Sequence, residues 1–114
     1  MKLASLNVFL CLLCLSRFVV AQNSYDCGDA PIVPTLVDGS TSTMDVLVEN
    51  SKEVKAFIAR ADEYLDCREK LYSRIIHKLQ KEDLREEIKK VTKQRNDIGD
   101  EFNDQVAAYK RANP

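Results

Sequence analysis

The 114-residue sequence contains no tryptophan, one histidine, three glycines and three prolines. The single histidine, His77, follows Ser73 at ordinary helical spacing on a charged surface, which is not a nucleophile beside an oriented base in a cleft. The glycines are too far apart to form a phosphate-binding loop. These absences predict that the protein is not an enzyme and has no catalytic residue, no metal site and no cofactor.

Long apolar runs are absent except at the N-terminus, where residues 3–15 are almost all apolar. Lys2 precedes this run and the small-residue sequence Val-Val-Ala at 19–21 follows it, which is the order of a secretory signal peptide. We therefore predict that residues 1–21 are removed on export and that the mature protein is periplasmic or secreted. A retained membrane anchor is the alternative, because the apolar stretch of about 18 residues is at the low end of spanning length.

Cysteine is scarce once the predicted signal is removed. Cys11 and Cys14 lie within it, and Cys27 and Cys67 are the only others. In a chain sent to an oxidising compartment, two cysteines favour one disulfide, and two free thiols are the alternative. A Cys27–Cys67 bond would close a loop of about 40 residues, which stabilises a fold by about 4 kcal/mol if the effect is entropic.

Neither glycine nor proline occurs between residues 40 and 98, and over much of this stretch apolar side chains recur at steps of three and four. This period predicts a long amphipathic helix over about residues 43–80. A capping signal at residues 42–45 marks its start.

A second helix is predicted over about residues 83–111. The hydrophobic phase slips between Leu79 and Leu84, and Asp83 begins another capping signature. The slip and the cap favour a hairpin over one continuous helix, which is the alternative. We therefore predict an all-α fold in which residues 43–112 form a long antiparallel two-helix hairpin.

Residues 22–42 form the non-helical part of the predicted mature chain. Pro31 and Pro34 favour extended geometry in the residues before them, and Asp38-Gly39 is a turn signal. An extended chain of this length can run antiparallel to the first helix and reach Cys67, so we predict that the disulfide ties it there. A Pro-x-x-Pro ligand for a proline-binding module is less favoured, because such modules are not expected outside the cytoplasm.

Folding the hairpin about residue 82 sets the register of the predicted seam. Ala61 then faces Phe102, a small residue opposite a large one, as close packing prefers. The same register pairs Ile76 with Ile88, Tyr72 with Val91, and Arg95 with a position near Glu69. Gly99 would lie near Cys67, where it either makes room for the tethered segment or faces solvent.

Several stretches together resemble a group of small exported proteins of Gram-negative bacteria. They are Pro31-x-x-Pro34, Asp38-Gly39, Val54 to Ile58, Tyr64 to Cys67, and Phe102 to Lys110. The group has no known activity. The resemblance implies export to the periplasm and the hairpin, and it implies no site residues.

Charge is unevenly distributed along the predicted mature chain. Residues 22–67 contain 3 basic and 9 acidic residues, residues 68–95 contain 10 and 5, and residues 96–114 contain 2 and 4. The hairpin places the basic segment at its tip, for which we predict an interaction surface. The alternative is a solvated helix face with local pairs. The predicted surface consists of Arg74, Lys78, Lys81, Arg85 and Lys89.

These observations predict a non-enzymatic structural or protein-interaction hairpin that meets a protein or envelope partner or a second copy of itself. One alternative is a carrier of small apolar ligands, which needs a closed cavity of about 300 Å³ or more. Another is a protein that binds the envelope surface through its basic tip. Nucleic acid is not an expected partner, because the basic segment lacks interleaved aromatics, and no small-molecule substrate is expected.

Overall fold

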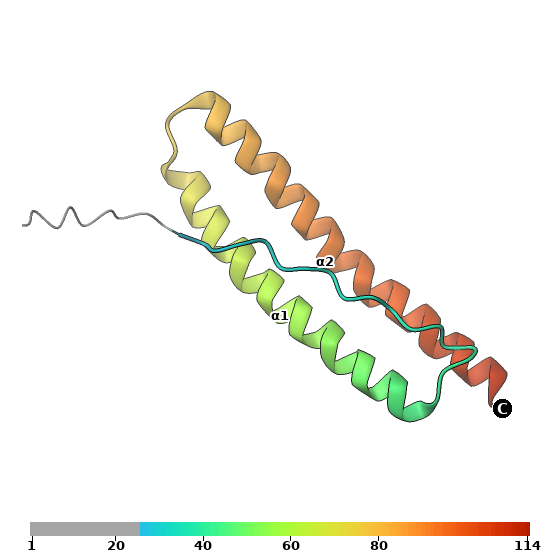
Figure 1. Cartoon of the computed structure of the whole chain (residues 1–114). Coiled ribbons are helices and arrows are strands. Elements are labelled where there is room, and N and C mark those ends of the chain that lie inside the picture. The colour runs from blue at the N-terminus through green and yellow to red at the C-terminus, as the bar shows by residue number, and fades with distance from the viewer. Residues whose placement is uncertain (1–25) are drawn as a thin grey trace, which may run out of the picture.

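A computed structural model describes residues 26–114, and the predicted signal peptide lies outside these residues. Within them the chain forms two helices, α1 (Met44–Arg74) and α2 (Lys78–Ala112), and no strand. The helices run antiparallel, and the segment that precedes α1 lies along them (Figure 1). The predicted all-α hairpin with a tied N-terminal segment is therefore confirmed.

The start of α1 agrees with its predicted capping signal, but the link between the helices does not. The Thr43 side chain caps α1 by accepting a hydrogen bond from the backbone N–H of Val46. α1 then ends at Arg74 instead of about residue 80, and α2 begins at Lys78 instead of about residue 83. Asp83 consequently lies inside α2 and caps nothing.

The position of the link follows from the balance between capping and packing. Residues 75–77 are extended at both ends, with ψ of 128° at Ile75 and 120° at His77. A side-chain cap contributes about 1 kcal/mol, whereas each large apolar side chain placed in the seam contributes about 1.5–3 kcal/mol. The alignment of the two apolar stripes therefore decides where the chain turns.

The seam has the spacing of an antiparallel coiled coil. Buried residues of α1 recur at steps of three and four from Leu47 to Tyr64, and those of α2 recur every seven residues. Phe57 and Ala61, both 0 % exposed, lie at its centre. The other buried apolar side chains of the seam are Leu47, Val54, Tyr64, Leu84, Val91 and Ile98.

The observed register differs from the predicted one by several residues. Arg95 pairs across the seam with Asp62, at 2.8 and 3.3 Å, and not with a residue near Glu69. Phe102 lines a groove with Leu47 and Ser51, which lie nearer the start of α1 than the predicted partner Ala61. Ile76 is 93 % exposed and faces no partner in the seam.

The N-terminal segment is attached at three points. The predicted disulfide between Cys27 and Cys67 is present, with the two Cα atoms 5.7 Å apart. Near the middle, the buried Asn50 amide of α1 accepts a hydrogen bond from the backbone N–H of Val37 at 3.2 Å and donates one to the Thr35 carbonyl at 2.9 Å. Val33, which lies between these two points, and Leu36, which lies at the second of them, pack against the core.

The third attachment is the turn at Asp38 and Gly39, which reaches α2. The Asp38 carboxylate accepts a hydrogen bond from the Ser40 backbone N–H at 2.9 Å, which confirms the predicted turn. The Gly39 N–H donates to the Gln105 side-chain oxygen at 3.0 Å. A Cβ at Gly39 would lie 1.8 Å from the Gln105 carbonyl oxygen, so only glycine fits here.

Gly99 is different, because a Cβ there would meet no atom within 4 Å. It therefore faces open space and does not make room for the tethered segment.

Candidate functional site at the hairpin tip

The hairpin ends in a segment without acidic residues, which we call the tip (residues 70–81). It comprises the last turn of α1, the link at 75–77 and the first turn of α2. The tip contains four basic residues, one histidine and no aspartate or glutamate. Positive charge is therefore concentrated at one pole of an elongated molecule.

Two aliphatic side chains of the tip are almost fully exposed. Ile76 is 93 % exposed and Leu79 is 82 % exposed. The predicted first helix, over about residues 43–80, includes both on its apolar stripe and pairs Ile76 with Ile88, but the earlier turn leaves both outside the seam. An exposed aliphatic side chain alone needs no explanation, but here two lie within four residues of one another at a basic pole.

The five predicted interaction residues divide into two groups. Arg74 is the last residue of α1, Lys78 is the first of α2, and Lys81 follows one turn later. Arg85 and Lys89 lie further back on α2; Lys89 is 11 residues after Lys78, about 16 Å along the helix axis. The structure therefore places Arg74 and Lys78 at the two ends of the link that carries Ile76, with Leu79 and Lys81 in the first turn of α2. Arg85 lies one turn behind Lys81 and shares Tyr72 with it, and Lys89 lies further back.

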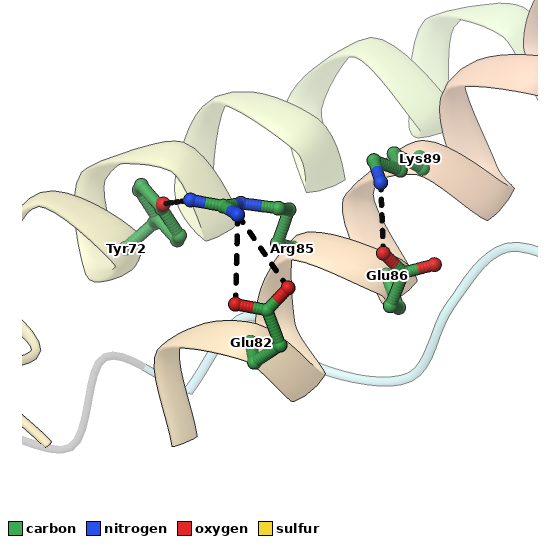
Figure 2. Close-up of polar contacts among 5 residues, drawn as sticks. All are labelled: Tyr72, Glu82, Arg85, Glu86 and Lys89. Carbon is green, nitrogen blue, oxygen red and sulfur yellow. Dashed lines mark hydrogen bonds and ion pairs between the residues drawn. The ribbon is translucent and has the colours of Figure 1, made fainter. Parts of the chain in front are cut away.

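Arg85 and Lys89 belong to ion pairs on the helix surface (Figure 2). Arg85 donates a hydrogen bond to the Tyr72 hydroxyl at 2.7 Å and pairs with Glu82 at 3.5 Å. Lys89 pairs with Glu86 at 2.8 Å. The Tyr72 hydrogen bond and the Glu82 charge raise the pKa of Arg85 above its ordinary value.

Tyr72 organises the base of the tip. The Lys81 Nζ lies 4.6 Å from the centre of its ring, within the range of a cation–π contact, while its hydroxyl accepts the Arg85 hydrogen bond. This side chain connects α1 to the first turns of α2 on the outside of the seam. The predicted register pairs Tyr72 with Val91 in the seam, and helical periodicity alone does not indicate that its side chain contacts Lys81 and Arg85 instead.

Behind the tip, a second polar cluster joins the helices. Tyr64, 4 % exposed, donates its hydroxyl hydrogen bond to Glu87, and Arg68 pairs with the same carboxylate at 3.4 Å. The Arg68 guanidinium also lies 4.9 Å from the centre of the Tyr64 ring. Burial first, and then the Glu87 hydrogen bond, raise the pKa of Tyr64. Together with the disulfide at Cys67, this cluster braces the stem that carries the tip.

The rest of the described chain contains neither a candidate metal site nor, beside the N-terminal segment, a closed ligand cavity. Among residues 26–114, no three His, Cys, Asp or Glu side chains converge to form a metal site. Depressions of about 440 and 380 Å³ lie beside the N-terminal segment, but both are open and have charged side chains in their walls. Neither is the closed apolar cavity that a carrier requires.

The chain matches no protein-family model, no curated protein and no solved structure. Its resemblance to small exported proteins therefore stays a prediction. Neither described helix holds a stretch that is long and apolar enough to cross a membrane.

Proposed function

We propose that this protein is a non-enzymatic, exported interaction module that docks the tip of its hairpin against an acidic surface of the cell envelope. The observation that carries the proposal is the composition of the tip, which contains four basic residues, no acidic one and the exposed Ile76. Lys70 is paired with Asp66 at 2.5 Å, so Arg74, Lys78 and Lys81 are the basic residues assigned to docking. The Cys27–Cys67 disulfide supports export, because such bonds persist in oxidising compartments.

The stem favours docking over a looser electrostatic attraction. Clustered exposed charges mainly steer association, and salt screens them over about 8–10 Å. The braced helices fix the backbone positions that carry the basic side chains, so less backbone freedom is lost when the tip meets a partner surface. A periplasmic or secreted location and a structural role in the envelope both agree with this arrangement.

The proposal is tested by charge reversal at the tip with a matched control. We compare the double substitution Lys78→Glu and Lys81→Glu with Lys52→Glu and Lys55→Glu, which makes the same change on exposed positions near the start of α1. The measurement is the fraction of exported protein that stays with the envelope after low-salt and high-salt washes. We expect the tip variant to be released and the control to be retained like the wild type. Equal retention of both variants would refute the proposal.

A further inference from the structure

We infer that the acidic surface is a bilayer of anionic phospholipid, and that Ile76 and Leu79 enter its interface while Arg74, Lys78 and Lys81 contact the headgroups. This inference rests on the proposed function and names the partner of the same site. It commits to lipid and treats an acidic protein as an alternative that the experiment distinguishes.

The size of the tip favours lipid. A specific protein interface engages about 20–30 residues on each side. The tip offers 12 residues at the narrow end of a two-helix rod, with only two aliphatic side chains fully presented. A bilayer needs no complementary pocket, and apolar side chains need to reach only about 5–10 Å below the headgroups.

The arrangement of side chains also fits a membrane interface. Arg74 and Lys78 stand on either side of the link that carries Ile76, so cations flank the apolar side chain on both helices. Long basic side chains can lay their aliphatic stems along apolar surface while the charged group stays with the headgroups.

The first carboxylate of α2, that of Glu82, lies just behind the tip and is paired with a basic side chain. Glu82 is four residues after Lys78, about 6 Å further from the link along the axis, and it pairs with Arg85 (Figure 2). Arg85 therefore offsets the charge that would otherwise oppose an anionic surface. Arg85 therefore contributes to the site by pairing with Glu82, although it lies outside the tip itself.

The experiment measures co-sedimentation of the exported protein with vesicles. One set is pure phosphatidylcholine, and in the other about a third of the lipid is phosphatidylglycerol. We expect binding to the anionic vesicles only, and weaker binding at high salt. Neutralising Lys78→Gln and Lys81→Gln should weaken it about fivefold for each lysine, or about 25-fold for the pair.

The decisive comparison concerns the aliphatic side chains. Ile76→Ser should weaken binding to the anionic vesicles about tenfold, because the side chain no longer enters the interface. Ile32→Ser is the matched control, since Ile32 is 86 % exposed on the N-terminal segment and should leave binding unchanged. Leu79→Ser repeats the test at a second tip position. All three side chains are exposed, so the fold should persist, and the melting temperature checks that it does.

The outcomes separate the inference from the proposed function. Binding that requires anionic lipid and falls in Ile76→Ser, but not in Ile32→Ser, supports the inference. Absence of vesicle binding, or binding that is indifferent to Ile76→Ser, overturns it. If envelope retention in the preceding experiment still depends on Lys78 and Lys81, the proposed function stands with an acidic protein as the partner. If retention does not depend on them, both fail.

Discussion

Asn50 is a polar side chain in an apolar seam, at only 3 % exposure. Its amide satisfies the backbone N–H of Val37 and the carbonyl of Thr35, two groups that a segment without secondary structure would otherwise leave unpaired. It also donates to the Glu53 carboxylate at 3.0 Å. The period of the sequence places position 50 on the buried face, but it does not reveal which backbone the amide meets.

The substitution Asn50→Asp tests this attachment. An aspartate keeps the shape but loses both amide donors, and it turns a negative charge toward the Thr35 carbonyl and the Glu53 carboxylate. We expect the free energy of unfolding at neutral pH to fall by about 1–3 kcal/mol in denaturant titrations. Asn103→Asp makes the same change at an exposed position of α2 and should have little effect. Equal stability of the two variants would mean that the amide is not needed.

Substitution by alanine should change the stability of the fold in opposite directions at two glycines. We expect Gly39→Ala to destabilise the fold by about 1–3 kcal/mol, because the new Cβ would collide with the Gln105 carbonyl oxygen. We expect Gly99→Ala to stabilise it by up to about 1 kcal/mol, because the helix gains a better helix former in open space. Thermal melts of both variants check the signs, and a shift in the same direction would show that one environment is wrong.

At the scale of elements, the sequence carries enough information for two helices, the turn at Asp38 and the disulfide. The steps of three and four along α1 depend only on local periodicity, and the cysteine count leaves few pairings. The position of the link was predicted wrongly because it depends on how two stripes align, which is a property of both helices together. The capping signature at Asp83 is a local signal, and the packing of Leu84 and Val91 outweighs it.

One substitution made at two leucines distinguishes the observed turn from the predicted one. Leu84 is 6 % exposed, so Leu84→Ala should cost about 2–5 kcal/mol. Leu79 is 82 % exposed, so Leu79→Ala should change stability by less than about 0.5 kcal/mol. A turn near residue 82 would instead place Leu79 in the seam. Chemical denaturation of the two variants therefore reports the register, and a large loss at Leu79 would restore the predicted hairpin.

For the whole molecule, the charge distribution along the sequence was enough to predict a basic pole. It was not enough to define its members, because moving the link changes which side chains lie at the end. Arg85 and Lys89 fall into surface pairs, whereas Ile76 and Leu79 leave the seam and become exposed. The candidate site thus depends on tertiary alignment, and its apolar half could not be found from composition alone.

The disulfide should contribute to the stability of the whole molecule but not to docking at the tip. It links the N-terminal segment to α1, but the tip begins three residues after Cys67 and is held by the seam and the Tyr64–Glu87 contact.

The double substitution Cys27→Ser and Cys67→Ser should lower the free energy of unfolding by about 4 kcal/mol, since a loop of 40 residues is no longer closed in the unfolded chain. At low temperature the helical circular dichroism should persist, because Asn50 and Gly39 still attach the segment. Envelope retention should persist with it. Free-thiol labelling of the unfolded wild type, without reductant, should find no reactive cysteine in the exported protein. Loss of helicity in the double variant without denaturant would show that the seam cannot hold the tip unless the segment is covalently bound.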